Sequence, residues 1–346
     1  MQQFIRKLEV WFATNRLSAS PQKSTVTLLT PDRRESNIHP HIILNDQRLP
    51  LNKTPTLLGL TYDTHMTFTP HVNRINLKAQ KRANSLRYLT NTNYGQQKES
   101  LTTLYKQFIR TSLNYATPAW HPSTSQTNRN KLQTTQNKAL RTITGCTRST
   151  PVQHLHDETP ILPLEEHQDM IGTQFFDKTS LPNHPNHHIF TQPPPSRNKK
   201  QHAGQHYRHI LNTIPPTPPD TNKMKHIHTT LTQRYLHSRH PNPLTGNHCP
   251  DVHISEQTLN RKTRTTLAQL RTGHSQLLGA YRHQIGLSNS PTCTRCNTQQ
   301  ADDTKHLLLE CPALDLPRSS SDLRAVDDLW ARPVVVGTYL SSAGLI

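Results

Sequence analysis

The chain has few apolar residues and few carboxylates for its length. Hydrophobic residues make up 32% of its 346 positions, and 22 Asp and Glu stand against 40 Lys and Arg. Globular domains are typically about 45–50% apolar, so we expect several small local cores in place of one large core. No run approaches the roughly 18–20 apolar residues of a transmembrane helix, so we expect no membrane-spanning segment and no membrane partner.

The sequence also has few cysteines and no recognisable secretion signal. Five Cys in a chain this long do not make a disulfide scaffold, which indicates a reducing compartment. The first residues, Met-Gln-Gln-Phe-Ile-Arg-Lys-Leu-Glu, contain no continuous apolar stretch of the kind found in a secretory signal. We therefore expect an intracellular protein, in the nucleus or the cytoplasm.

Positive charge is abundant and unevenly distributed. The formal net charge is +18, and a charge of this size favours a polyanionic partner, most commonly nucleic acid. Residues 64–156 contain 13 Lys and Arg and one carboxylate, Glu99. Residues 195–290 contain another 13 with three carboxylates, Asp220, Asp251 and Glu256. Both segments are typical of a surface that faces nucleic acid, and the alternative is a solvated basic face without a partner.

The first part of the chain, 1–69, has a mixed pattern. Apolar residues recur on one stripe over 2–16, which predicts an amphipathic helix. A hairpin is predicted around Asn45-Asp46-Gln47, and short strands are predicted over 25–30 and over 56–63, the last with Gly59 at its centre. This part is expected to be a small mixed α/β unit.

The following part, 70–181, is predicted to be helical. Apolar residues recur at three- and four-residue steps, and a third helix is expected to stop at Gly145. Such helices pack on their apolar stripes and turn their basic sides outward. The outward candidates for nucleic-acid contact on the first of them are Arg74, Lys78, Lys81 and Arg82.

The rest of the chain divides into a linker and a C-terminal segment. Nine prolines between 182 and 219, including Pro193–Pro195, predict an extended Pro/His-rich linker over 182–260 that is partly disordered. Residues 261–346 are expected to hold one more helix, a metal motif and a tail. The fold class is therefore α+β, with a mixed remnant, a helical bundle, a linker and a C-terminal metal-binding module.

One motif has metal-ligand spacing. Cys293 and Cys296 are followed after nine residues by His306 and after four more by Cys311. Three thiolates and one imidazole suit zinc, and four protein ligands leave no position for a catalytic water, so the motif predicts a structural Zn²⁺ site. The alternatives are a coincidence among 23 His and, elsewhere, a weak metal pair at His248-Cys249 with His253.

Catalytic constellations are sparse. Two-metal polymerase chemistry needs several converging carboxylates, and the Asp-Asp pairs of this sequence are Asp302-Asp303 and Asp327-Asp328. The first pair follows Ala301 but lies inside the metal loop and lacks the preceding aromatic residue of polymerase hairpins. We therefore predict no catalytic residue in this sequence.

Several blocks together resemble one protein family. The segment 8–23, the stretch Leu57-Leu58-Gly59-Leu60-Thr61-Tyr62-Asp63, the block Gln136–Gly145, the block Arg264–Gly273 and the metal motif occur in the order found in one group of reverse transcriptases. The chain resembles the C-terminal part of a jockey-like non-LTR retrotransposon reverse transcriptase, from the end of the palm through the thumb to the zinc knuckle. The resemblance covers nearly the whole chain.

The resemblance implies roles for individual residues. Lys23 corresponds to a lysine near the phosphates of the incoming nucleotide, and Gly59 to a glycine of the primer grip. The basic residues of the thumb, which would contact the phosphates of a template–primer duplex of RNA or DNA, are Lys131, Lys138, Arg141 and Arg148. Arg295 flanks the zinc loop and is a further candidate for phosphate contact.

The resemblance also implies what is missing. The metal-binding aspartates of the family's palm are expected upstream of Met1, so the predicted function is backbone binding of RNA or DNA without a catalytic centre. A first alternative is a part of an active RNA-directed DNA polymerase whose catalytic palm, with its Mg²⁺, lies upstream. A second alternative is a zinc-dependent adaptor for protein partners, and a third is a decayed copy.

Overall fold

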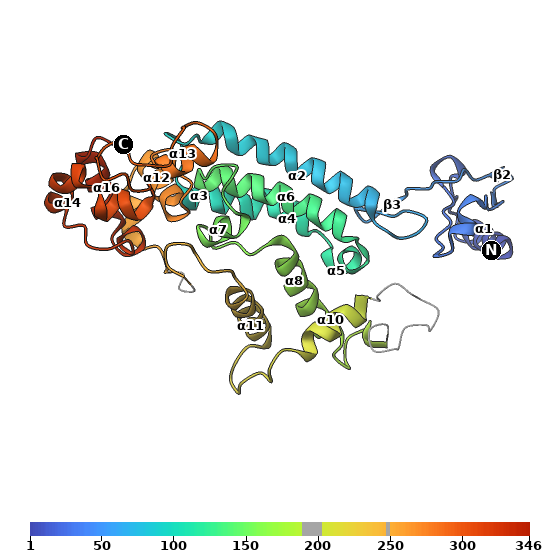
Figure 1. The fold of residues 1–346 in the computed structure, drawn as a ribbon. Coiled ribbons are helices and arrows are strands. Elements are labelled where there is room, and N and C mark those ends of the chain that lie inside the picture. Colours follow the sequence, from blue (N-terminus) through green and yellow to red (C-terminus); the bar gives the residue numbers. More distant parts are fainter. Residues whose placement is uncertain (189–202, 247–249) are drawn as a thin grey trace. The chain divides into compact units, whose positions relative to one another are not determined.

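Helices dominate the chain, and the strands are few and short. The computed structural model describes residues 1–188, 203–246 and 250–346. In these ranges the strands form two hairpins with two residues per strand, and the remaining regular structure is helical (Figure 1). The predicted mainly helical α+β class is confirmed. No helix of the described ranges is both long enough and apolar enough to cross a membrane.

The chain forms two compact units. Unit 1 comprises residues 1–77, 114–132 and 171–215, and unit 2 comprises 78–113, 133–170 and 216–346.

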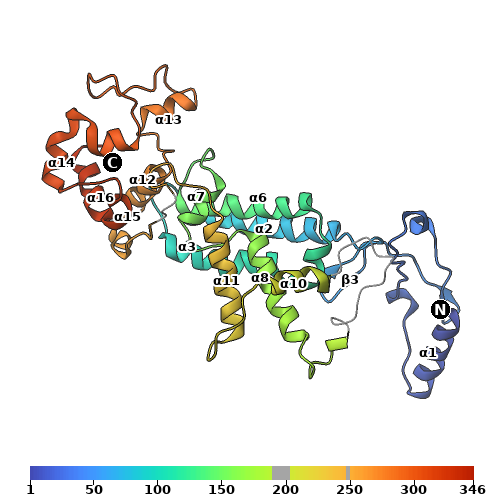
Figure 2. The same cartoon turned by 60° about the horizontal axis from the view of Figure 1, so that its bottom comes forward.

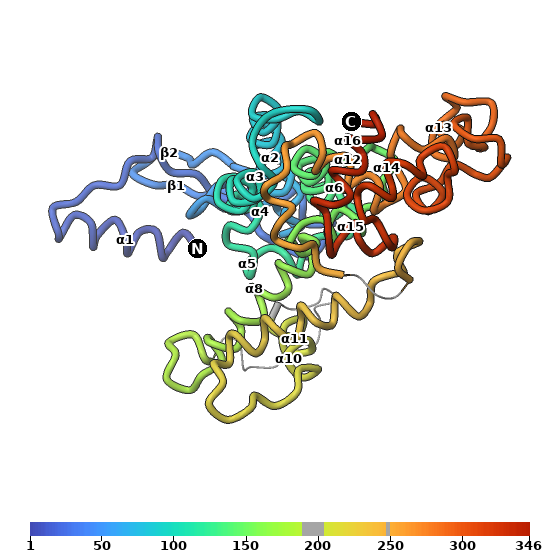
Figure 3. The backbone as a smooth tube through the Cα atoms, turned by 90° about the vertical axis from the view of Figure 1, so that its left-hand side faces the viewer, coloured from blue at the N-terminus to red at the C-terminus, as the bar shows by residue number. Residues whose placement is uncertain are grey.

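Unit 1 begins with a small α/β element. Helix α1 (Gln2–Thr14) lies beside the hairpin of β1 (Ile43–Leu44) and β2 (Gln47–Arg48), as Figure 3 shows. The turn residues Asn45 and Asp46 both have positive φ, which matches the twist of a tight hairpin. The predicted helix and the first hairpin are thus present, whereas Val26 of the expected strand over 25–30 makes a single bridge to Leu51.

The remaining elements of unit 1 contain the buried aromatic residues Trp120 and Tyr207. They are β3 (Thr56–Leu57), β4 (Leu60–Thr61), the start of α2 (Thr69–Leu89), α5 (Thr117–Trp120), the start of α6 (Gln126–Thr144), the end of α8 (Leu164–Thr179) and α10 (Ala203–Asn212); short 3₁₀ turns lie at Pro21–Lys23, Arg33–Asn37 and His121–Ser123. A β-carbon on Gly172 would lie 2.1 Å from a ring carbon of Tyr207. Glycine at 172 therefore lets α10 pack directly on α8.

The first layer of unit 2 contains the helices that the apolar stripes predict. It comprises the later parts of α2 and α6, then α3 (Lys98–Leu104), the π-helical turn η3 (Tyr105–Ile109), the start of α4 (Arg110–Asn114), α7 (Val152–Asp157) and the start of α8. Figures 1 and 2 show α2 and α6 running side by side. Ala79, Ala83 and Leu86 are buried on α2, as are Leu140 and Ile143 on α6. Helix α6 ends before Gly145, which has the positive φ of a helix stop, as predicted.

The second layer of unit 2 is the C-terminal module. It comprises η5 (Ile254–Thr258), α12 (Arg261–Arg271), α13 (Gly279–Gln284), η6 (His306–Glu310), η7 (Pro312–Leu314), α14 (Asp315–Ser321), α15 (Asp328–Ala331) and α16 (Pro333–Ser342). Helix α11 (Lys223–His237) precedes this module, and its residues line a pocket together with residues of α7 and α8. Figure 2 shows α12, α14, α15 and α16 gathered around the C-terminus. Leu270, Cys293, Cys311, Trp330 and Tyr339 belong to one buried cluster there. The metal motif is therefore built into a larger core and is not a separate small module.

The segment 182–260 differs from the extended linker that its prolines predict. Helices α10 and α11 form within it, and Tyr207 and Ile227 are buried. Helix α10 lies between the two proline runs and α11 follows the second run, and apolar residues recur at helical spacing in both helices. Pro193–Pro195 lie outside the described residues.

Candidate nucleic-acid interface and metal centre

A polar groove runs between α2 and α6 within unit 2. Its volume is about 790 Å³, and the described residues that line it include four cations and no carboxylate. The lining residues are Gln80, Ala83, Asn84 and Arg87 from α2, Thr134, Thr135, Asn137, Lys138, Arg141 and Thr142 from α6, and Cys146 and Arg148 from the loop that follows. A concave surface with cations of one sign attracts an extended polyanion.

The positions of the groove cations on α6 follow from the spacing of residues in a helix. On α6, Ala139, Leu140 and Ile143 turn inward, so Lys138 and Arg141 lie on the adjoining face three residues apart. Arg141 donates hydrogen bonds to the carbonyls of Thr147 (3.2 Å) and Thr150 (3.1 Å). Arg141 thereby holds the loop that carries Arg148. Burial lowers the pKa of Arg141, but a guanidinium stays charged at neutral pH.

Cys146 lines the groove, but its environment does not activate the thiol as a nucleophile. Burial and the nearby Glu158 raise the pKa of its thiol to about 12, so the sulfur is a neutral thiol at physiological pH.

Three of the predicted contact residues therefore meet in the groove, and Arg87 joins them. Arg87 lies off the apolar stripe of α2 in the sequence. That position was the signal by which Arg87 could have been predicted as a contact residue. Lys78 and Lys81 are exposed on α2 but do not line the groove.

Arg82 has a different place from the one predicted. Its guanidinium lies 4.4 Å from the ring centre of Phe108 and donates to the Phe108 carbonyl (2.6 Å) and to Ser112. These contacts tie α2 to η3 and α4. Arg82 thus serves packing, because its donors are used by neighbouring helices.

The predicted residues of unit 1 lie at several places. Lys23 is exposed at the end of its 3₁₀ turn. Gly59 has φ +81 at the tip of the β3–β4 hairpin, where its carbonyl accepts a hydrogen bond from Arg74. The Lys131 ammonium lies 3.3 Å from the Asn73 amide oxygen. Arg74 therefore fixes the hairpin that the resemblance assigns to the primer grip.

Three of the four basic residues of α12, Arg261, Arg264 and Arg271, are internal. Arg261 donates to the carbonyls of Thr142 (2.9 Å) and Ile143 (2.5 Å), and so caps the last turn of α6. Arg264 and Arg271 are 4% and 1% exposed. The expectation that the whole basic stretch 195–290 faces nucleic acid is wrong for these three residues, because helix ends and carboxylates of unit 2 bind them.

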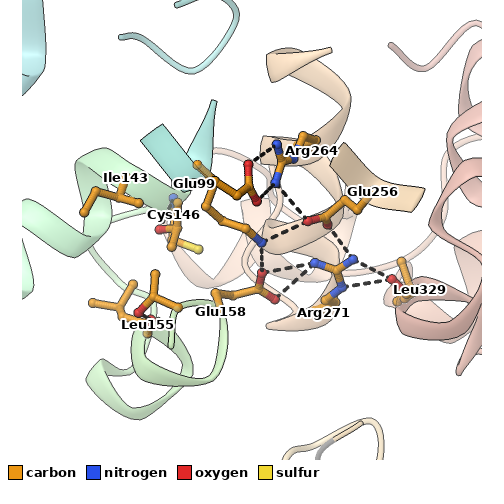
Figure 4. Close-up of polar contacts among 12 residues, drawn as sticks. Glu99, Ile143, Cys146, Leu155, Glu158, Glu256, Arg264, Arg271 and Leu329 are labelled. Carbon is orange, nitrogen blue, oxygen red and sulfur yellow. Dashed lines mark hydrogen bonds and ion pairs between the residues drawn. The ribbon is translucent and has the colours of Figure 1, made fainter. Parts of the chain in front are cut away.

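A buried ion-pair network holds α12, and the sequence did not predict it (Figure 4). Arg271 pairs with Glu158 (3.0 Å) and Glu256 (2.7 Å). Lys98 contacts the same two carboxylates at 3.5 and 2.9 Å. Arg264 lies 3.5 Å from Glu256 and also pairs with Glu99. The possible signal was the isolation of Glu99 and Glu256 within strongly basic segments, whereas Glu158 lies just outside them.

The four ligands of the metal motif converge. Their ligand atoms all lie within 4.8 Å of one another, and His306 and Cys311 are almost fully buried. The sulfurs of Cys293 and Cys311 are 3.9 Å apart, and Cys296 Sγ lies 3.4 Å from His306 Nε2. Bond lengths to zinc imply tetrahedral edges of about 3.8 Å between sulfurs and about 3.5 Å between sulfur and nitrogen. The cluster can therefore hold a zinc ion.

Neighbouring groups orient these ligands. His306 Nδ1 lies 2.9 Å from the Gln300 side-chain oxygen, which leaves Nε2 for a metal. The backbone amide of Arg295 points at Cys293 Sγ at 3.4 Å. Hydrogen bonds from Thr298 lower the pKa of Cys296 to about 6, which favours the thiolate that binds metal.

Arg295 and Asp302 brace the metal loop. The guanidinium of Arg295 pairs with the fully buried Asp302, whose other oxygen accepts from the amide of Gly279 at 2.8 Å. Arg295 is therefore used within the fold and not as the predicted phosphate contact. His248 and Cys249, the alternative metal pair, lie outside the described residues.

Two curated proteins of Drosophila melanogaster match part of the chain. The probable RNA-directed DNA polymerase from transposon BS is 24% identical over 181 residues, which is 51% of this chain and 19% of that protein. The corresponding protein from transposon X-element is 23% identical over 146 residues, 42% of this chain and 16% of that protein. The chain thus spans less than a fifth of the length of either relative.

No protein-family model and no solved structure matches the chain. The two partial matches nevertheless confirm the predicted resemblance of this sequence to the reverse transcriptases of non-LTR retrotransposons.

Proposed function

We propose that this chain is part of a jockey-like reverse-transcriptase-related protein and holds RNA or DNA by its backbone in the α2–α6 groove. The single observation behind this proposal is that Arg87, Lys138, Arg141 and Arg148 converge on one groove without a carboxylate among its lining residues. The proposal includes an intracellular site of action, a palm-like part over 1–69, a thumb-like part over 70–181 and a structural Zn²⁺ at Cys293, Cys296, His306 and Cys311.

The groove suits phosphates better than base edges. Lys and Arg contact phosphate oxygens in any sequence, so such contacts set position and register without reading the bases. Asn84, Asn137 and the threonines of the walls add neutral hydrogen-bonding groups between the cations. A template–primer-like duplex of RNA, DNA or both is the partner that we propose, with little sequence preference.

The aspartate pairs support a binding role without catalysis. Asp302 is held by Arg295 and the Gly279 amide. Asp328 pairs with Arg332 and accepts hydrogen bonds from the amides of Arg324 (2.9 Å) and Ala325 (3.1 Å). Two-metal chemistry needs carboxylates that converge on ions, and these are used by cations and amides of the fold. Primer extension by the purified chain with Mg²⁺ or Mn²⁺ would overturn this part of the proposal.

The names of the two relatives favour a second candidate function. Both are described as probable RNA-directed DNA polymerases. This chain would then be the nucleic-acid-holding part of an active polymerase, with Mg²⁺ bound by a catalytic palm encoded upstream. An in-frame aromatic-Ala-Asp-Asp sequence a short distance upstream of Met1 would decide for this candidate.

We expect binding to duplex nucleic acid to weaken steeply with salt. If all four groove cations contact phosphates, the logarithm of the association constant should fall against the logarithm of salt with a slope of about −3.6. Lys138→Gln should reduce the magnitude of that slope by about 0.9, because one phosphate contact is removed. Fluorescence anisotropy with a labelled 20-mer duplex at several salt concentrations measures both values.

The matched control is Lys178→Gln, which removes one exposed positive charge outside the groove. This variant should keep the slope of the parent chain. Equal slopes for Lys138→Gln and the parent chain, or a salt-independent affinity, would contradict the proposed groove.

A further inference from the structure

A second pocket of unit 2 contains two cations that no described residue pairs with. Its volume is about 350 Å³, and it shares no residue with the α2–α6 groove. The residues that line it come from η3, α4, α7 with the loop that follows, α8 and α11: Lys106, Arg110, His156, Thr159–Leu162, His167, Met170, His228, Thr232, Tyr235 and Leu236. None of them is a carboxylate.

The two cations are one helical turn apart and lack partners. Among the described residues, neither Lys106 nor Arg110 forms an ion pair or a side-chain hydrogen bond. Burial lowers the pKa of both groups, and for Lys106 the nearby Arg110 lowers it further. A partly buried guanidinium without a counter-charge is costly, and an anion in the pocket would remove that cost.

Neutral hydrogen-bonding groups in the same pocket are also unsatisfied. The Nδ1 atom of His167 and the hydroxyl of Thr232 are buried, and neither has a hydrogen-bond partner within the described ranges. Burial, and after it the charges of Arg110 and His228, lowers the pKa of His167 to about 4. His167 is therefore a neutral imidazole beside two cations. By contrast, His156 is fixed by a 2.8 Å contact from Nδ1 to the carbonyl of Ile161.

The other walls of the pocket are apolar. Ile161, Leu162, Met170 and Leu236 contribute side chains that can contact a ring or a short hydrocarbon group but not an ion. The volume lies at the small end of ligand pockets, which span roughly 300–1,000 Å³. A bare phosphate would leave these walls uncovered, and a purely apolar ligand would leave the cations unpaired.

We propose that this pocket binds the phosphate monoester of a small planar organic group, such as a mononucleotide, with the phosphate at Lys106, Arg110 and His167. Thr232 supplies a further hydrogen bond to the phosphate. The apolar walls cover the base. A doubly charged monoester, free or at the 5′ end of a strand, distinguishes this site from the groove, where singly charged backbone diesters are proposed to bind. The proposed ligand of the pocket can therefore bind whether or not nucleic acid binds in the groove.

The test uses the purified full chain and adenosine monophosphate as the probe. Isothermal titration should show binding of adenosine monophosphate, weaker binding of inorganic phosphate and no binding of adenosine. Arg110→Gln should weaken adenosine monophosphate binding by roughly tenfold or more, as expected for loss of hydrogen bonds to a charged group. A 5′-phosphorylated dinucleotide distinguishes the two sources of the monoester. If it competes with adenosine monophosphate, the pocket binds the 5′ end of a strand. If it does not compete, the pocket binds the free nucleotide.

Two controls separate binding from folding. Lys225→Gln removes an exposed charge on α11 outside the pocket and should leave the affinity for adenosine monophosphate unchanged. Arg110→Gln should keep or raise the melting temperature in the absence of ligand, because it removes a partly buried charge without a partner. A lowered melting temperature would assign Arg110 a structural role. Equal affinity of Arg110→Gln and the parent chain, or no binding of the probe at all, would overturn the proposal.

Discussion

Removal of zinc, or the substitution Cys311→Ser, is expected to unfold the C-terminal core of unit 2. Cys293 and Cys311 belong to the same buried cluster as Trp330 and Tyr339. The binding free energy of a structural zinc site is of order 10 kcal/mol, and the net stability of a folded domain is about 5–15 kcal/mol. Loss of the metal would therefore remove a free energy similar to the whole stability. Elemental analysis and thermal unfolding monitored by near-UV circular dichroism measure the two effects.

Two further variants test whether the metal is the cause. Cys296→Ser replaces the most exposed cysteine ligand and should also lose zinc, although its side chain contributes less to the core. Cys146→Ser changes a buried cysteine that is not a ligand, so this control should retain one zinc ion per chain. A chain that purifies without zinc, or a Cys296→Ser variant with full zinc content, would show that the cluster does not bind the metal.

Features set by neighbours in sequence were predictable. The Asn45-Asp46 turn has the positive φ values that a tight hairpin requires, and both residues tolerate them. The convergence of the four candidate metal ligands was also predictable, because two cysteines three positions apart and a return segment with His306 and Cys311 bring these side chains together locally. In both cases the short spacing leaves few alternative geometries.

Features that depend on distant partners were not predictable. Arg82 has the outward position of a phosphate contact on α2, yet it lies over Phe108, 26 residues away. Arg261 has the same basic character as Lys138, but it caps α6 from more than 100 residues further along the chain. Helical period shows which side of a helix a cation occupies and not which other helix covers that side.

The structure shows where the few carboxylates of the chain lie, which the composition does not. Glu99, Glu158 and Glu256 lie far apart in sequence, yet together they neutralise the buried Arg264 and Arg271 and the partly buried Lys98. Part of the positive charge is therefore internal. None of these three carboxylates is among the described residues that line the groove, whose cations are Arg87, Lys138, Arg141 and Arg148.

Arg271→Met is expected to destabilise unit 2 by about 3 kcal/mol or more, because it leaves two buried carboxylates with one remaining shared cation, Lys98. The lost guanidinium also donates to the carbonyl of Leu329 at 2.6 and 2.9 Å. Urea denaturation at pH 7 measures the change in the free energy of unfolding. The control Arg324→Met breaks an exposed pair with Asp322 and should change stability little.

The same network predicts how stability depends on pH. Burial raises the pKa of Glu256, but the charges of Arg271 and Lys98 outweigh it and lower that pKa to about 2. A carboxylate with a lowered pKa in the folded state contributes stability above its unfolded value, near 4.5, and this contribution is lost as the pH falls from there towards 2. In Arg271→Met the pKa of Glu256 rises, so the variant should lose less stability between pH 5 and pH 3 than the parent chain does. Parallel curves of unfolding free energy against pH for the two proteins would contradict a stabilising role for the network.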